Sequence, residues 1–334
     1  MACGGLTPTT RLGQHPGVDV ADHAGEHRVD VGSVTLCYEL LGDPGDPVVL
    51  LIAGLGRSLL GWDDDFCGRL IGEGLRVLRF DNRDAGLSTS IEAGRVFDLA
   101  AARRDGRGAV AYTLDDMADD AAGLLRALGI TDAHVVGTSM GGMIAQMLAV
   151  RHPAMVRSLC SIMSTTGAAG VGEPTAEALA VVMQRPPTDR ASYVATELAN
   201  QRVIGSRRDL VDEAWRRGRF ERLFDRGLNP RGTGRQIMAI VASGDRTAAL
   251  GSISAPTVVI HGDADTLVPL SGGEATARAI PGAQLVVLPD MGHEIPPRAW
   301  AAVTGAILAN ANRAGVRTPP PTNASASRQA EVPW

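Results

Sequence analysis

A serine in a glycine-flanked turn is the feature of this sequence that points most directly to chemistry. Residues 137–141 read GTSMG and match G-x-S-x-G, with an apolar run before Ser139 and apolar residues at helical spacing after it. This context predicts a sharp strand-to-helix turn that exposes the serine hydroxyl. A serine hydroxyl is a weak nucleophile at neutral pH and needs a histidine base that is itself oriented by a carboxylate. If Ser139 reacts, the chain must also supply that base and that acid.

His293 is the predicted base. It lies in LPDMGHEIPPRAW, a loop between the last predicted strand and the final amphipathic helix, and such a loop can carry an imidazole over the serine. The other histidines precede the first strand, lie at unsuitable ends of a strand or helix, or, for His261, are expected to pack beside the site. These are His15, His23, His27, His134, His152 and His261.

The predicted acid is an aspartate that follows an apolar strand between the serine and the histidine. The stretch VVIHGDADTLVP offers Asp263 and Asp265 directly after such a strand. We assign the role to Asp265 and keep Asp263 as the alternative, since either could also be a turn-forming residue. The order serine, aspartate, histidine along the chain is one that α/β sheets use for this chemistry.

Two backbone N–H groups are predicted to hold the oxyanion of a tetrahedral intermediate. Met140, the residue after the nucleophile, supplies the first N–H. The turn Gly54-Leu55-Gly56 follows the first long strand, and we assign the second N–H to Leu55. The same glycines could begin a dinucleotide-binding loop, but Leu59 stands where G-x-G-x-x-G needs glycine, which argues against a nicotinamide cofactor.

Short apolar runs indicate the strands that would position these residues. They begin at residues 48, 76, 134, 158, 257 and 284, and helical patterns separate most of them. Uniformly apolar strands are typical of a parallel sheet that is covered on both faces. The alternation predicts a mostly parallel, doubly wound α/β sheet, preceded by an antiparallel hairpin in HRVDVGSVTLCYELLG. Thr113 and Asp116 form a capping signal for one of the helices.

The chain is expected to divide into a core and an inserted helical cap. Residues 26–164 and 251–313 form the predicted core. Residues 165–250 are mostly helical in pattern and rich in arginine, and they form the predicted cap over the carboxyl edge of the sheet. The two ends, residues 1–25 and 314–334, are rich in small residues and proline and are expected to be flexible.

Charged pairs and large apolar residues stand out in the predicted cap. The pairs Asp212/Arg216 and Glu213/Arg217 have i,i+4 spacing and are expected to form a solvated helix face. Large apolar residues of the cap, with one tryptophan near the predicted oxyanion turn, could line an apolar acyl or alcohol pocket or form the core of the cap. These candidates are Trp62, Met183, Trp215, Phe220 and Met238.

Composition argues against several other classes of function. The net charge of -5 does not suit nucleic acid, whose phosphates require a basic surface. All 32 basic residues are arginine, so a Walker-type phosphate loop and Schiff-base chemistry lack their lysine. The four cysteines are scattered, and we expect neither a zinc site nor a disulfide framework. No stretch reads as a secretory signal or a membrane span, and we expect a cytoplasmic protein.

The sequence resembles the serine α/β-hydrolases over about residues 34–311. The resemblance rests on LLIAGLG, RFDNRDAGLSTS, YTLDDMADDAAGLL, VVGTSMGGMIAQ, APTVVIHGDADTLVP and MGHEIP, in this order. It looks closest to bacterial carboxylesterases and to the methylesterases that act on anthracycline antibiotics. It implies an α/β-hydrolase fold in which Ser139 is the nucleophile, Asp265 its acid and His293 its base.

The chain departs from the resembling family at two places. Ala53-Gly54 stands where many relatives carry His-Gly, which leaves the choice of the second oxyanion N–H open. Asp84 stands where many relatives carry glycine; the resemblance implies that its loop orders the floor of the site, and we assign it no chemistry. Serine at position 139 argues against the dehalogenases and epoxide hydrolases of this fold, which use aspartate there.

We therefore expect a serine hydrolase that cleaves a small carboxylic ester through an acyl-enzyme and needs no cofactor. Three alternatives stay open: a cofactor-free perhydrolase or haloperoxidase-like enzyme with the same three residues, a methylesterase of secondary metabolism, and a non-catalytic ligand receptor on the same fold. Nothing in the sequence assigns an oligomeric state.

Overall fold

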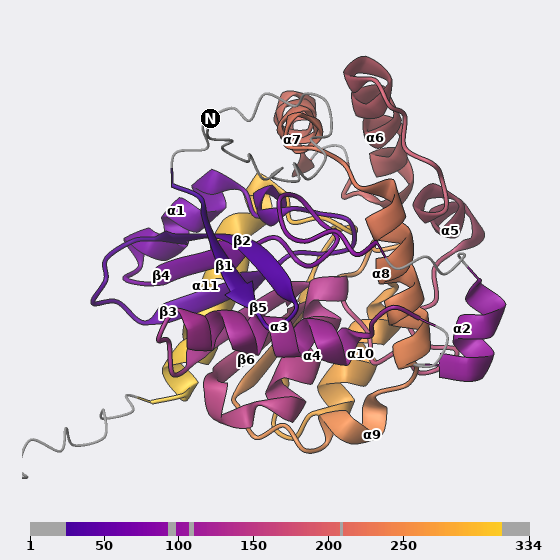
Figure 1. Cartoon of the computed structure of the whole chain (residues 1–334). Coiled ribbons are helices and arrows are strands. Elements are labelled where there is room, and N and C mark those ends of the chain that lie inside the picture. The colour runs from indigo at the N-terminus through magenta and orange to yellow at the C-terminus, as the bar shows by residue number, and fades with distance from the viewer. Residues whose placement is uncertain (1–24, 93–97, 107–109, 208–209, 316–334) are drawn as a thin grey trace, which may run out of the picture.

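An eight-stranded sheet forms the centre of the molecule (Figure 1). The computed structural model describes residues 25–92, 98–106, 110–207 and 210–315, so nearly all of the two ends that we expect to be flexible lies outside the described residues. The strand order is β1-β2-β4-β3-β5-β6-β7-β8. The strands are β1 (His27–Val31), β2 (Val34–Leu41), β3 (Val48–Ile52), β4 (Arg76–Phe80), β5 (Ala133–Thr138), β6 (Val156–Ile162), β7 (Thr257–Gly262) and β8 (Gln284–Leu288).

The sheet is antiparallel only at its amino-terminal edge. β1 pairs with β2, and β2 with β4, in antiparallel register, whereas the pairs β4–β3, β3–β5, β5–β6, β6–β7 and β7–β8 are parallel. The antiparallel β1–β2 hairpin and the parallel strands match the predicted hairpin and parallel sheet, and this strand order confirms the doubly wound α/β fold. The carboxyl ends of β3, β5 and β7 therefore meet at one edge, where loops from distant parts of the chain come together.

Helices cover both faces of the sheet. α1 (Asp64–Gly72) and α11 (Trp300–Arg313) pack on one face, and α3 (Leu114–Ala127) and α4 (Met140–Arg151) pack on the other, next to α10 (Leu270–Ala279). α3 begins as its capping signal predicts, because the Thr113 N–H donates to Asp116 Oδ2 over 2.7 Å.

β8 differs from the expectation that every apolar run is covered on both faces. Its side chains are partly or fully exposed, with exposed fractions of 37% for Leu285 and 40% for Val287. β8 is the last strand of the sheet and pairs only with β7. The apolar residues 285–288 thus predicted the strand but could not predict its place at the edge.

The chain between β6 and β7 forms the inserted helices, which lie along one end of the sheet (Figure 1). Tyr193, Val194, Phe220 and Leu223 form a small apolar core between two of these helices. The exact division of the chain into core and cap stays a prediction. The inserted helices are α5 (Ala176–Val182), α6 (Arg190–Ile204), α7 (Glu213–Asp225), α8 (Pro230–Ser243) and α9 (Thr247–Leu250), and α2 (Leu99–Asp105) packs against α8.

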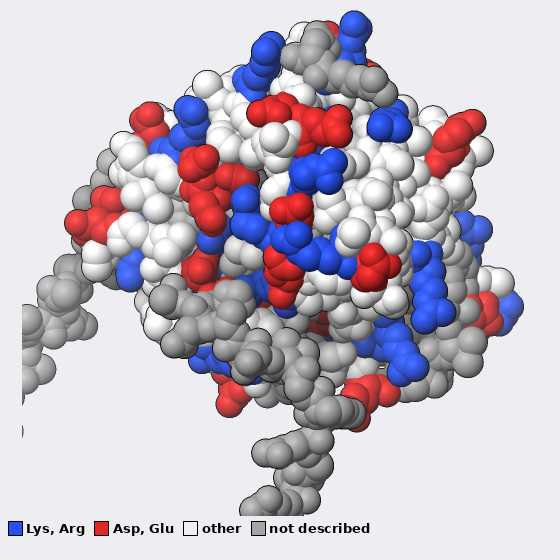
Figure 2. All heavy atoms as spheres, turned by 90° about the horizontal axis from the view of Figure 1, so that it is seen from above, with Lys and Arg blue, Asp and Glu red and all other residues white. Residues whose placement is uncertain are grey.

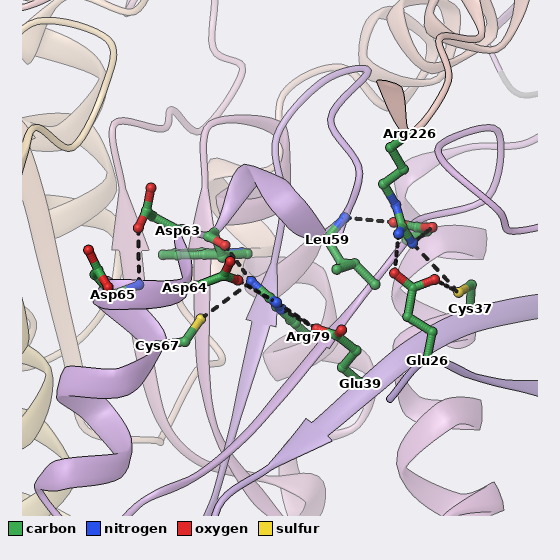
Figure 3. A network of polar contacts seen from close by, with 12 residues as sticks. Glu26, Cys37, Glu39, Leu59, Asp63, Asp64, Asp65, Cys67, Arg79 and Arg226 are labelled. Atoms are coloured by element: carbon green, nitrogen blue, oxygen red, sulfur yellow. Dashed lines mark hydrogen bonds and ion pairs between the residues drawn. The ribbon is translucent and has the colours of Figure 1, made fainter. Parts of the chain in front are cut away.

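Arginines of the inserted region reach into the core. Arg226, at the carboxyl end of α7, is fully buried and forms ion pairs with Glu26 and with Asp81, the latter over 2.7 Å. Figure 3 shows Arg226 pointing toward Glu26 and Cys37. Arg235 of α8 similarly binds both carboxylate oxygens of Asp84. These buried pairs fasten α7 and α8 to the loop that follows β4.

No helix in the described part of the chain is long and apolar enough to cross a membrane.

Candidate active site

Ser139 occupies a strained turn between β5 and α4. Its backbone has φ 54° and ψ -121°. Residues other than glycine rarely adopt such a positive φ. The flanking glycines are required by space: a Cβ on Gly137 would lie 2.1 Å from the Gly141 carbonyl oxygen, and one on Gly141 would lie 2.1 Å from the Ile52 carbonyl oxygen. The predicted glycine pattern thus reflects direct backbone contact on both sides of the serine.

The structure brings Ser139 and His293 together across 154 positions of sequence. His293 Nε2 lies 2.9 Å from Ser139 Oγ, and His293 Nδ1 lies 2.7 Å from Asp265 Oδ2. Because a carboxylate only accepts hydrogen bonds, Nδ1 donates to Asp265, which leaves Nε2 of a neutral imidazole free to accept from the serine hydroxyl. The three side chains therefore have the geometry in which a histidine can remove a proton from a serine.

Asp265 is held by its own turn. Its side chain is fully buried, and its Oδ1 accepts hydrogen bonds from the N–H groups of Leu267 and Val268, each over 2.9 Å. Asp263, the alternative acid, instead accepts a hydrogen bond from the Asp290 N–H over 2.7 Å and is exposed. Of the two aspartates, the structure places Asp265 against His293.

His261 lies beside the site but is engaged elsewhere. It is buried, and its Nε2 lies 2.7 Å from the Val268 carbonyl oxygen, so that nitrogen carries the proton. Burial lowers the pKa of His261, which favours the neutral ring. The ring also fills the space that a Cβ on Gly273 would need, since such an atom would lie 2.4 Å from His261 Nδ1. His261 thus packs next to the Asp265 turn, as expected.

The turn at residues 54–56 lies directly against the serine. A Cβ on Gly54 would be 3.4 Å from Ser139 Cβ. In the described part of the chain, none of the hydrogen bonds uses the N–H of Leu55 or of Met140 as donor. Met140 is the first residue of α4, where N–H groups have no partner in the helix and the helix dipole is positive. Both N–H groups are therefore free to bind an anion.

The inserted helices hold this turn in place. Gln236 of α8 is fully buried; its Oε1 accepts a hydrogen bond from the Gly56 N–H, and its Nε2 donates to the Arg83 carbonyl, each over 2.8 Å. Gly56 has φ +63°, and a Cβ there would lie 2.7 Å from Thr233 Oγ1 of the same helix. No local sequence pattern predicts this contact, because the two residues are 180 positions apart.

The inserted helices also hold the histidine loop. The His293 N–H donates to the Ile204 carbonyl over 2.6 Å, and the Gly292 N–H donates to Ser206 Oγ over 3.0 Å. Glu294, the next residue, forms a buried ion pair with Arg216 of α7. The expectation that Arg216 lies on a solvated face is therefore wrong. Arg217 does lie there, 3.8 Å from Glu213.

A cavity of about 500 Å³ adjoins Ser139 and His293 and is lined by both the core and the inserted helices. Of the predicted pocket residues, Trp62 and Trp215 line it. Met183 is exposed on the surface, and Met238 and Phe220 are buried in the inserted region without lining the cavity. Most residues that line the cavity were therefore not among the predicted ones. Helical spacing alone could not distinguish cavity-lining residues from residues in the core of the cap.

Charged residues that the sequence did not single out also line the cavity. Arg57 pairs with Glu197 over 2.8 Å, and its Nη1 donates to the Tyr193 hydroxyl over 3.2 Å. Arg219 of α7 lines the same cavity. The position of Arg57, directly after the glycine turn at residues 54–56, was the sequence signal that could have marked it.

Within the described residues, no three or more histidine, cysteine, aspartate or glutamate side chains are grouped so that they could hold a metal ion. Three cysteines lie in the described part, and all are buried free thiols. Burial raises the pKa of the Cys67 thiol to about 12, which disfavours its nucleophilic thiolate form.

Comparisons with known proteins agree with this architecture. Rhodomycin D methylesterase DauP of Streptomyces sp. strain C5 is 30% identical over 312 residues, which cover 85% of this chain and 97% of that protein. A Mycobacterium tuberculosis protein, provisionally named non-heme bromoperoxidase BpoC, is 30% identical over 78% of this chain and 91% of its own. The crystal structure of a hydrolase from Pseudomonas aeruginosa PA01 has a TM-score of 0.65 and 26% identity, covering 86% of this chain and 99% of that chain. The profile of the alpha/beta hydrolase fold family matches residues 47–297, and this chain therefore belongs to that family.

Proposed function

We propose that this protein is a serine esterase that hydrolyses carboxylic esters through an acyl-enzyme intermediate. Ser139 is the nucleophile, His293 the general base and Asp265 the carboxylate that orients it. The observation that carries the proposal is the pair of contacts on one imidazole, 2.9 Å to the serine hydroxyl and 2.7 Å to the aspartate. The methylesterase name of a relative that is 30% identical over 85% of this chain supports an ester as substrate.

The reaction follows from the positions of these groups. Ser139 Oγ attacks the ester carbonyl while His293 Nε2 takes the hydroxyl proton, and Asp265 stabilises the resulting imidazolium. The N–H groups of Leu55 and Met140 bind the oxyanion. His293 then protonates the leaving alcohol, and water, activated by the same imidazole, releases the acid from the serine. These steps need no cofactor.

The test is to replace the nucleophile and measure both labelling and turnover. Ser139→Ala should abolish covalent labelling by a fluorophosphonate probe and lower hydrolysis of p-nitrophenyl esters by at least about a thousandfold. Ser164→Ala is the matched control, because the Ser164 hydroxyl is buried near α4 and has no hydrogen-bond partner among the described residues. Near-normal ester hydrolysis by Ser139→Ala would refute the proposal.

A second candidate function uses the same three residues. The relative provisionally named as a bromoperoxidase is 30% identical over 78% of this chain, and hydrogen peroxide could replace water in attack on an acyl-enzyme. Acetate-dependent peracid formation, compared with hydrolysis of an acetate ester by the same preparation, distinguishes the two. Peracid formation faster than hydrolysis would favour the second function.

A further inference from the structure

Two arginines of the candidate substrate cavity lie close together. Arg219 Nη2 donates to the Gly61 carbonyl over 3.0 Å, and a Cβ on Gly61 would lie 3.2 Å from Arg57 Cβ. The guanidinium of Arg57 also packs over the ring of Phe220, the residue after Arg219, at 5.8 Å. Both arginines line the cavity next to Ser139. Two positive charges therefore share one part of a largely apolar cavity.

The charge of Arg57 is compensated within the protein. Its Nη2 lies 2.8 Å from Glu197, and its Nη1 donates to the Tyr193 hydroxyl. Although burial lowers the pKa of Arg57, the Glu197 carboxylate and the Tyr193 hydroxyl together outweigh that effect, and the pKa is raised. Arg57 and Glu197 together therefore add little net charge to the cavity.

The charge of Arg219 is not compensated in the same way. In the part of the chain that the structure describes, no carboxylate forms an ion pair with it. The three carboxylates whose charges act on Arg219 are already engaged: Glu294 with Arg216, Asp63 with the Trp215 indole and Arg222, and Glu197 with Arg57. Burial, followed by the charge of Arg57, lowers the pKa of Arg219.

Within the described residues, Arg219 makes two other contacts, and only one of them uses an N–H donor. It bonds the Gly61 carbonyl and lies over the Trp215 ring at 5.7 Å. A guanidinium has five N–H donors in a planar fork that matches a carboxylate. On the molecular surface, by contrast, basic side chains lie beside acidic ones (Figure 2). In the inserted helices, the exposed Arg190 pairs with Asp225 over 2.7 Å. Desolvated cations without an anionic partner are costly, and a bound anion would remove that cost.

We propose that Arg219, with Arg57 beside it, binds a carboxylate of the substrate, so that the enzyme acts on esters that carry an anionic group away from the ester bond. This inference rests on the ester hydrolysis proposed above and names its substrate class: half esters of dicarboxylic acids and esters of comparable charge. The carboxylate accepts two N–H donors from the Arg219 fork, and the apolar walls of the cavity contact the chain between the two carboxyl groups.

The first test compares charged with neutral esters. Methanol release is measured for monomethyl esters of glutaric to suberic acid and for the corresponding dimethyl esters. The wild type should favour the monomethyl ester of at least one chain length. Arg219→Gln should lower the ratio of kcat/KM for monoester over diester by about ten- to hundredfold, since a hydrogen bond to a charged group contributes about 1.5–3 kcal/mol.

Two further variants control this test. Arg219→Lys keeps the charge and should retain much of the preference, although it loses the fork geometry. Arg217→Gln alters an exposed arginine of the same helix that pairs only weakly with Glu213, and its ratio should equal that of the wild type. A ratio that does not change in Arg219→Gln would overturn the proposal.

The second test is independent of turnover. Adipate binding to Ser139→Ala is measured by calorimetry and compared with the double variant Ser139→Ala/Arg219→Gln, which should bind at least about tenfold more weakly. Adipate binding that depends on Arg219, in a wild type that hydrolyses no ester, would refute the proposed esterase and keep the anion site. Ester hydrolysis without Arg219-dependent binding or preference would refute the anion site alone.

Discussion

The ion pair between Arg216 and Glu294 allows a quantitative test of how the inserted helices hold the histidine loop. Only 9% of the Arg216 side chain and 1% of the Glu294 side chain are exposed. Glu294 also accepts a hydrogen bond from the Ser206 N–H over 2.8 Å, and Arg216 Nη2 donates to the Ser206 carbonyl over 3.0 Å. Replacing Arg216 by methionine keeps an unbranched side chain about as long as the aliphatic part of arginine, but leaves Glu294 as a buried carboxylate that still accepts from the Ser206 N–H.

Removing one partner of a buried pair costs about 3–5 kcal/mol, because the other charge stays desolvated. This is a large part of the about 5–15 kcal/mol by which proteins are stable. We expect Arg216→Met to lower the free energy of unfolding by about 3 kcal/mol or more at pH 7. Equilibrium unfolding in urea, followed by tryptophan fluorescence, measures it.

Two further variants test whether the loss of stability comes from the unpaired buried charge. Arg217→Met removes an exposed partner 3.8 Å from Glu213 and should change stability by less than about 0.5 kcal/mol. Arg216→Met/Glu294→Leu removes both charges and should recover most of the loss, since an apolar pair of similar size can replace a buried ion pair. A loss below about 1 kcal/mol in Arg216→Met, or no recovery in the double variant, would refute this account of the contact.

Two other predictions follow from buried positions. Gly141→Ala places a Cβ 2.1 Å from the Ile52 carbonyl oxygen, so it should cost about 3 kcal/mol or more in the same urea assay, whereas Gly68→Ala on the exposed side of α1, with no atom within 4 Å, should be neutral or slightly stabilising. Burial lowers the pKa of His134 from 6.5 to about 4, so the unfolded chain binds a proton that the folded chain does not, and stability should fall by up to about 3 kcal/mol as the pH drops from 6.5 to about 4. His134→Asn should show a smaller fall over this window in urea titrations at several pH values, and an equal fall would contradict the prediction.

The strands and the order of the site residues were predictable because their signals are local. An apolar run marks a strand, a glycine pattern around Ser139 marks a turn in which two backbones touch, and a parallel sheet brings the ends of such strands to one edge. The contacts of Ser139, His293 and Asp265 follow from that topology. The loop after the last strand is long enough to carry His293 over the serine. The choice between Asp263 and Asp265, in contrast, depends on the hydrogen bonds within a single turn.

The spacing of residues in the sequence did not predict that Arg216 of α7 points into the protein. The i,i+4 pair of Asp212 with Arg216 suggested a solvated face, but Arg216, Phe220 and Leu223 also follow one another at helical spacing, and the latter two are buried in the apolar core of the inserted helices. Asp212 instead caps α7 by accepting a hydrogen bond from the Ala214 N–H. Helical periodicity thus identifies which residues share a face of a helix. Whether that face is buried or exposed depends on residues elsewhere in the chain.

Those distant partners determine how the inserted helices and the core depend on each other. Gln236 reaches the turn at residues 54–56 from 180 positions away, and Arg216 reaches the loop that carries His293 from 78 positions away. Arg226 reaches Asp81 across 145 positions. Each contact replaces hydration of a buried polar group, so separating the inserted helices from the core would leave several such groups unpaired at once. The helices inserted between β6 and β7 therefore help to hold both the turn beside Ser139 and the loop that carries His293.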